Sequence, residues 1–174
     1  MPKKIVVITG SSHQGGTSVR LADAFIKGLG DRHTVTRFDA GLVGARRHDD
    51  LVPQYVDRNE SAVPVNDRIQ ELIPQLEAAD MIVLVTPLYY YGPTAQLKAV
   101  IDRFYAYNHE MKGKDSAILA TAYDPVEKFK ALDAWYDTLC PYMRWNNRGK
   151  IYAGQAWSQL DRYLQAANAL GQQI

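Results

Sequence analysis

The sequence of 174 residues contains one cysteine, Cys140, and no marked excess of charge of either sign. A single cysteine excludes an internal disulfide and a protein-ligated iron-sulfur cluster, and it is typical of a reducing compartment. The 20 basic residues are balanced by 19 acidic ones. Composition therefore gives no reason to expect nucleic acid or an acidic membrane surface as a partner.

Long hydrophobic runs are also absent. No apolar stretch reaches the roughly 18 residues needed to cross a bilayer, and Met-Pro-Lys-Lys leads into a strand-like run without a cleavable signal pattern. We therefore predict a cytoplasmic protein that does not bind membranes. With 47% hydrophobic residues, the chain can bury a sizeable core. We predict one domain over residues 1–174.

Strand-like and helical patterns alternate along the whole chain. Strands are predicted at 5–9, 33–38, 81–85, 116–121 and 150–153, and helices at 21–29, 67–77, 93–105, 124–140 and 158–170. Gly28 and Gly30 are expected to help end the first helix. Five such units predict an α/β three-layer sandwich, in which helices cover both faces of a parallel sheet.

Strand polarity predicts the strand order. Strands one, three and four are almost entirely apolar, as strands buried on both faces are, whereas strands two and five carry polar residues typical of edges. The expected order is 2-1-3-4-5. The chain then reverses direction between strands one and three, so a ligand is expected above their carboxyl ends.

Several local signals add to this outline. Pro74 should kink the second helix or mark its start, and Pro93 should open the third. Asp124 is expected to cap the fourth helix, with Pro125 at its first position and Glu127 in the reciprocal capping slot. Residues 41–66 show no regular pattern, and we interpret them as one long loop.

A loop rich in glycine and hydroxyl groups follows the first strand, with the sequence Gly10-Ser11-Ser12-His13-Gln14-Gly15-Gly16-Thr17-Ser18. It lacks the lysine of nucleoside-triphosphate loops and the glycine spacing of the dinucleotide fingerprint. Its backbone N–H groups, hydroxyl groups and following helix suit a single phosphomonoester bound without a metal. The alternative is an ordinary glycine-rich turn between a strand and a helix.

A second distinctive loop follows the third strand, with the sequence Thr86-Pro87-Leu88-Tyr89-Tyr90-Tyr91-Gly92-Pro93. Three consecutive tyrosines in a turning loop point in different directions, so at least one should be exposed. Across a crevice from a phosphate loop, such a tyrosine suits a flat conjugated ring. Alternatively, the tyrosines cover helix ends or form a subunit contact.

Together, these loops resemble those of the flavodoxin-like NAD(P)H-dependent flavin reductases, which include FMN reductases and the flavoprotein part of iron-sulfur flavoproteins. The segment from Ala95 to Arg103 resembles the helix that follows the flavin loop of that family. The resemblance implies a flavodoxin-like fold and an FMN cofactor. It implies that the phosphate is held by Ser11, His13, Gly16, Thr17 and Ser18, and the isoalloxazine by Pro87, Leu88, Tyr89, Tyr90 and Gly92, partly through backbone N–H groups. Thr121, Ala122 and Tyr123 would complete the pocket.

The sequence also departs from the family pattern. Iron-sulfur members carry a cysteine cluster where this chain has residues 41–66, and His13 stands where many relatives have arginine. Tyr123 replaces a small residue and would narrow the substrate side of the flavin. Arg46, Arg47 and Arg58 would suit a lid or a partner-subunit arm that meets nucleotide phosphates, and the alternative is a solvated insertion.

No metal site is expected, because no cluster of His, Asp and Glu has metal-ligand spacing, and His48 and His109 are interpreted as surface residues. Trp135, Trp145 and Trp157 suit either the core or a dimer face.

We interpret the protein as an NAD(P)H-dependent FMN oxidoreductase that passes electrons to a small acceptor such as a quinone, a nitro or azo compound, or free flavin. No catalytic side chain is needed, because the flavin carries the chemistry. Alternatives are a flavodoxin-type electron carrier and a phosphate-binding module that has lost flavin. A receiver domain would need acidic residues where Thr9-Gly10 and Thr86-Pro87 stand. A homodimer is expected, because a partner would exclude water from the flavin.

Overall fold

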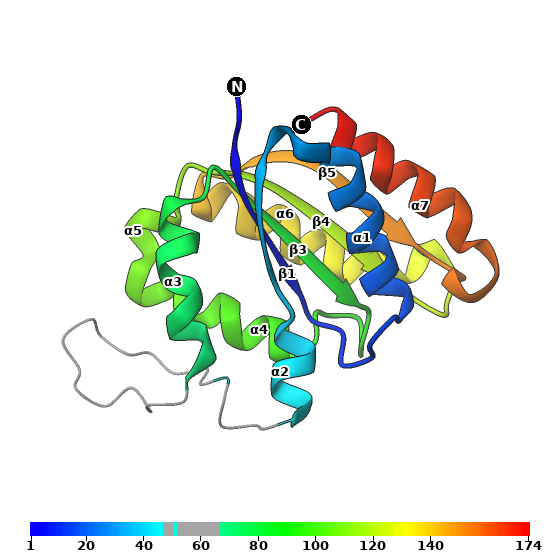
Figure 1. The fold of residues 1–174 in the computed structure, drawn as a ribbon. Coiled ribbons are helices and arrows are strands. Elements are labelled where there is room, and N and C mark those ends of the chain that lie inside the picture. Colours follow the sequence, from blue (N-terminus) through cyan, green and yellow to red (C-terminus); the bar gives the residue numbers. More distant parts are fainter. Residues whose placement is uncertain (47–50, 52–66) are drawn as a thin grey trace.

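Five parallel strands form the central sheet, in the order β2-β1-β3-β4-β5, which confirms the predicted order (Figure 1). The computed structural model describes residues 1–46, 51 and 67–174. The strands are β1 (Lys4–Thr9), β2 (Thr34–Phe38), β3 (Met81–Pro87), β4 (Asp115–Thr121) and β5 (Asn146–Ala153). The three inner strands are almost wholly buried, and β2 and β5 are partly exposed, as their sequences predict.

Helices cover both faces of the sheet (Figure 1). Alternate side chains of each inner strand point to opposite faces, so Ile5 and Val7 belong to one core, and Val6 and Ile8 to the other. The first core is closed by α1 (Thr17–Leu29) and α7 (Ala156–Gln172). The second is closed by α3 (Arg68–Ala78), α4 (Ala95–Asp102) and α6 (Lys130–Met143). Shorter elements are η1 (Gly30–Arg32), α2 (Ala40–Arg46), η3 (Arg103–Tyr107), α5 (Asn108–Met111) and η4 (Val126–Phe129).

The carboxyl ends of the inner strands lie level with one another. Thr9 pairs in register with Val85, and Thr121 pairs with both Pro87 and Ala153. The backbone then brings neighbouring loops into direct contact, since the Gly10 N–H donates to the Val85 carbonyl over 2.8 Å. A side chain at Gly10 would lie 2.2 Å from Thr94 Oγ1, so only glycine fits there. The loops predicted to form the site therefore meet at one edge of the sheet.

The start of the segment interpreted as a loop is helical. Helix α2 packs against the loop of residues 10–18, which we call the phosphate loop. A Cβ at Gly41 would lie only 2.1 Å from the Ser11 carbonyl oxygen. Asp39 precedes α2 and accepts hydrogen bonds from Thr9 Oγ1 and Arg37 Nε. The loop interpretation is therefore wrong at its beginning. Arg47, His48 and Arg58, and the Arg46 side chain, lie outside the described residues.

Two predicted helix starts differ from the structure. Helix α4 begins at Ala95, because Thr94 Oγ1 caps it by accepting from the Leu97 N–H. Asp124 does not cap a helix, since its carbonyl accepts from the Gln155 N–H over 2.8 Å and holds the loop extended until η4 begins.

Helix α3 also differs in part. It runs through Pro74 rather than starting there, and the Asp67 side chain caps it by accepting from the Ile69 N–H.

Gly28 is a contact point rather than a stop signal. It lies inside α1, and a Cβ there would stand 2.0 Å from the Asn168 carbonyl oxygen of α7. Gly171 of α7 makes the reciprocal contact with α1, 2.3 Å from the Phe25 carbonyl oxygen. Helix α1 instead ends at Gly30, whose φ of 60° suits glycine. The two helices thus pack backbone to backbone.

We expect Gly28→Ala to lower the free energy of unfolding by about 1–3 kcal/mol, because the added methyl group meets backbone and forces the helices apart. The better helix propensity of alanine, about 1 kcal/mol, does not offset this. Urea denaturation followed by circular dichroism measures the change. Gly92→Ala is the control, since its methyl group would enter open space. Equal stability of the two variants would contradict the backbone contact.

Candidate functional site

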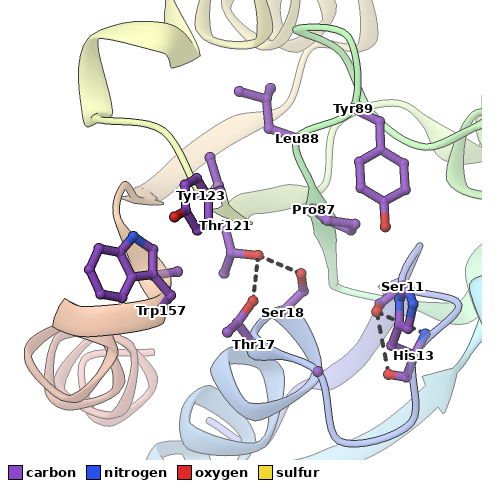
Figure 2. A pocket seen from close by; sticks show the side chains of 13 residues that line it. Ser11, His13, Thr17, Ser18, Pro87, Leu88, Tyr89, Thr121, Tyr123 and Trp157 are labelled. Carbon is purple, nitrogen blue, oxygen red and sulfur yellow. Dashed lines mark hydrogen bonds between the residues drawn. The ribbon is translucent and has the colours of Figure 1, made fainter.

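A cavity of about 360 Å³ lies at the carboxyl ends of the strands. This volume is within the range of small-molecule sites. Four loops contribute to its wall, which is lined by Ser11, His13, Gly16, Thr17, Ser18, Pro87, Leu88, Tyr89, Thr121, Ala122, Tyr123, Ala156 and Trp157 (Figure 2). The structure therefore brings together every residue predicted for the site except Tyr90 and Gly92.

One end of the cavity is formed by the phosphate loop. Ser11 is buried, and its Oγ accepts from the His13 N–H over 3.3 Å and donates to the His13 carbonyl over a long 3.4 Å. Gly15 has a φ of 73°, and the Gly16 N–H donates to the His13 carbonyl, so the loop folds back on itself. Helix α1 begins beside it with neither a capping side chain nor an acidic residue in its first turn. The positive end of α1 is therefore available to an anion.

A cluster of three hydroxyl groups, which we call the hydroxyl cluster, lies in the middle of the cavity (Figure 2). Thr17 Oγ1 donates to Thr121 Oγ1 over 3.1 Å, and Ser18 Oγ lies 2.6 Å from Thr121 Oγ1. Ser18 and Thr121 are both buried. Three hydroxyl hydrogens serve two hydrogen bonds within the cluster, so one hydrogen is left for a further acceptor. The Ser18 hydroxyl, predicted to face the phosphate, is thus hydrogen-bonded to Thr121.

Residues 86–93, which we call the tyrosine loop, present one of their three tyrosine rings to the cavity. Tyr89 and Gly92 exchange backbone hydrogen bonds of 3.2 and 3.1 Å, which closes a tight turn with Tyr90 and Tyr91 at its tip. Both tip residues have a positive φ, 48° and 66°. Tyr89 lines the cavity, whereas Tyr90 is fully exposed at the tip. Tyr90 and Gly92 therefore build the turn that carries Tyr89, and neither lies on the cavity wall.

Backbone N–H groups of this loop are largely engaged within the protein. The Leu88 N–H donates to the Thr121 carbonyl over 2.8 Å, and the Ala122 N–H donates to the Ala153 carbonyl over 2.9 Å. These bonds tie β3, β4 and β5 together where the cavity begins. The N–H groups of Leu88, Tyr89 and Gly92 are thus all hydrogen-bonded within the protein.

Sequence reasoning missed Ala156 and Trp157, which line the cavity from the start of α7. The Trp157 ring stacks on Tyr123, with ring centroids 5.7 Å apart and an interplanar angle of 22°. A signal was present, because Trp157 follows β5 at the same edge of the sheet as the predicted loops. Of the other tryptophans, Trp145 is buried, and its Nε1 donates to the Met111 carbonyl.

Among the described residues, His13 is the only cavity-lining side chain with an imidazole, carboxylate, amine or thiol group. No Asp, Glu, Lys or Arg of the described residues lines the cavity. Within residues 1–46, 51 and 67–174, no group of three His, Cys, Asp or Glu residues is placed to hold a metal. Cys140 is buried in α6, where burial raises the pKa of its thiol and keeps it protonated. The arrangement suits an elongated ligand with an anion at one end and a flat ring at the other.

Comparison with known proteins agrees with this geometry. Residues 3–158 match the sequence model of a family described as NADPH-dependent FMN reductase. An iron-sulfur flavoprotein from Methanocaldococcus jannaschii is 25% identical over 100 residues, which cover 58% of this chain and 51% of that protein. The chain thus spans about half the length of this curated relative.

Two solved structures illustrate the shared fold. An NAD(P)H:quinone oxidoreductase from Methanothermobacter marburgensis has 17% identity and a TM-score of 0.68, with 99% of this chain and 96% of that chain covered. An FMN-dependent NADH-azoreductase from Bacillus anthracis, solved in complex with FMN, has 13% identity and a TM-score of 0.67, with 97% and 96% covered. In the part of the chain that the structure describes, no helix is long and apolar enough to cross a membrane.

We expect Thr121→Val to lower the free energy of unfolding by about 1–3 kcal/mol, because it keeps the shape of the side chain but leaves buried Ser18 without its partner. Denaturant unfolding measures this change. Thr138→Val is the matched control, since its hydroxyl lies on the exposed face of α6 and donates to the Ala134 carbonyl. If Thr121→Val lowers the free energy of unfolding no more than Thr138→Val does, the hydroxyl cluster does not hold the loops together.

Proposed function

The chain belongs to the NADPH-dependent FMN reductase family, and we propose that it binds FMN in this cavity and reduces a small aromatic acceptor at the expense of NAD(P)H. The family makes it an NAD(P)H-dependent flavin oxidoreductase. The proposal adds the place of the cofactor and the kind of acceptor. The observation that carries it is the meeting of the phosphate loop, the tyrosine loop and the loop after β4 in one cavity of about 360 Å³.

The residues present fit FMN at both ends of the cavity. Ser11, His13 and the uncapped start of α1 offer donors to the phosphate without any acidic residue in the first turn. The flavin ring would find apolar and aromatic surface on Pro87, Leu88 and Tyr89. The remaining hydrogen of the hydroxyl cluster would be directed at the ligand between these ends.

Bound FMN supplies hydride chemistry, in which NAD(P)H gives up a hydride and the acceptor gains two electrons and two protons, one of them from solvent. The protein's part is to bind and to orient. The phosphate loop would fix one end of the cofactor, while the bonds from Leu88 to Thr121 and from Ala122 to Ala153 hold the walls around the ring. This division explains why the cavity needs no Asp, Glu, Lys or Arg.

We also propose a single domain over residues 1–174 that forms a homodimer in the cytoplasm. Large aromatic side chains stand exposed on the tyrosine loop beside the cavity: Tyr89, Tyr90 and Tyr91. A partner covering this loop would exclude water from the flavin. The backbone at Tyr90 supports this, because a non-glycine residue with positive φ costs on the order of 1 kcal/mol and points to a functional constraint.

The first experiment tests FMN binding through its phosphate. The purified protein should take up FMN, show flavin absorption bands and lose them when NAD(P)H is added without oxygen. Ser11→Ala removes one hydrogen bond to a charged group, which is worth roughly 1.5–3 kcal/mol. FMN affinity should therefore fall about 10- to 150-fold, as measured by quenching of flavin fluorescence.

Riboflavin is the matched control, since it has the same ring without the phosphate. Its affinity should change little in Ser11→Ala, whereas a misfolded variant would lose both ligands. Equal FMN affinity of wild type and variant would show that the phosphate loop is assigned wrongly. A wild type that binds no FMN would remove the proposed function.

The homodimer gives a separate prediction for Tyr90→Asn. Asparagine accepts a positive φ at this turn position far better than tyrosine, so the monomer should become more stable. The lost ring should weaken the dimer. Sedimentation velocity at micromolar protein should therefore show a dimer for wild type and a shift toward monomer for the variant. A wild-type monomer with full NAD(P)H turnover would contradict the proposed assembly.

A further inference from the structure

The loops after β4 and β5 are joined by their backbones into one rigid unit. The Ala156 N–H donates to the Ala122 carbonyl over 3.0 Å, and the Gln155 N–H donates to the Asp124 carbonyl over 2.8 Å. Between these bonds, a Cβ at Gly154 would stand 2.4 Å from the Val126 nitrogen, so the two loops touch without intervening side chains. The positions of Tyr123 and Trp157 relative to each other are therefore set by the backbone.

These two residues form a stacked pair that we call the aromatic pair. Trp157 is 64% exposed and Tyr123 is 76% exposed, although each contacts the other. Both line the cavity, and Figure 2 shows them on the side away from Tyr89. Large rings held in one orientation and left uncovered lose little side-chain freedom when a ligand stacks on them. The aromatic pair is thus preorganised to receive a flat ring.

The charge of the wall narrows the choice of ligand. Among the described residues, only polar uncharged, apolar and aromatic side chains line the cavity, apart from His13 at the phosphate end. A charged acceptor loses solvation when it leaves water and lies against the aromatic pair. No Asp, Glu, Lys or Arg among the described lining residues compensates for that loss. An uncharged planar compound would gain apolar contact and ring stacking without that cost.

We infer that the aromatic pair recognises the electron acceptor, and that it selects uncharged planar aromatic compounds such as quinones over charged, non-planar oxidants. This inference rests on the proposed function, because the acceptor must lie beside bound FMN. Trp157 acts here as a specificity-determining residue. Its position after β5 adds a wall that the phosphate loop and the tyrosine loop do not supply.

The test compares two acceptors with the FMN-loaded enzyme at saturating FMN and NAD(P)H. 1,4-Naphthoquinone is planar and uncharged and takes two electrons, whereas ferricyanide is an octahedral anion that takes one, so two ions are reduced for each NAD(P)H. Trp157→Ala should raise the ratio of the naphthoquinone KM to the ferricyanide KM roughly 2- to 12-fold, the range expected for one stacking contact. The kcat for naphthoquinone should change less than its KM.

Two further variants and a binding measurement separate stacking from general damage. Trp157→Phe keeps a ring and should restore most of the wild-type ratio. Tyr142→Ala is the matched control, because Tyr142 is 57% exposed and lies outside the cavity lining, against Lys112. Equilibrium dialysis of naphthoquinone against oxidised, FMN-loaded enzyme should show the same loss of affinity in Trp157→Ala without turnover.

The outcomes separate the inference from the proposed function. If Trp157→Ala leaves both the KM ratio and the dissociation constant unchanged while the wild type reduces both acceptors, the inference is wrong and the proposed function stands. The inference is also wrong if Trp157→Phe behaves like Trp157→Ala, or if Tyr142→Ala produces the same change. If the wild type reduces neither acceptor, the proposed function falls and takes the inference with it.

Discussion

The shape of the cavity depends on Thr121, the last residue of β4. Its hydroxyl oxygen contacts Thr17 and Ser18 at the start of α1, and its carbonyl accepts from the Leu88 N–H after β3. One buried residue thus joins the elements that follow β1, β3 and β4. These bonds fix the start of α1 and the start of the tyrosine loop relative to the end of β4.

The fold was predictable because its signals are repeated along the chain. The buried inner strands are apolar runs in the sequence, whereas the edge strands contain polar residues. Together with the alternation of strands and helices, this difference predicts the observed strand order. The phosphate loop and the tyrosine loop were predictable because unusual residue types stand where a parallel sheet places its ligands. Position in the sheet and residue type agreed for both loops, and that agreement led to residues that line one cavity.

The errors arose where a tertiary contact decided the local structure. Asp124 has the sequence of a helix cap, but the bond from Gln155 to its carbonyl holds it in an extended loop. Gly28 resembles a stop signal, but α1 needs it to lie against α7. Helix α2 was missed because Gly41 weakens the helical pattern, although the same glycine lets α2 approach Ser11. Trp157 was missed because its residue type does not decide its place, since a lone tryptophan suits a core as well as a cavity, and the one signal was its position after β5.

One hydroxyl hydrogen of the hydroxyl cluster is not fixed to a single oxygen. Thr17 donates to Thr121, but the bond between Thr121 and Ser18 runs in either direction. When Ser18 donates, the uncommitted hydrogen is on Thr121, and when Thr121 donates, it is on Ser18. Rotation of two hydroxyl groups therefore moves a donor between oxygens 2.6 Å apart while every heavy atom stays in place. The cavity wall at this point can therefore offer a hydrogen-bond donor from either of two oxygens without any movement of its heavy atoms.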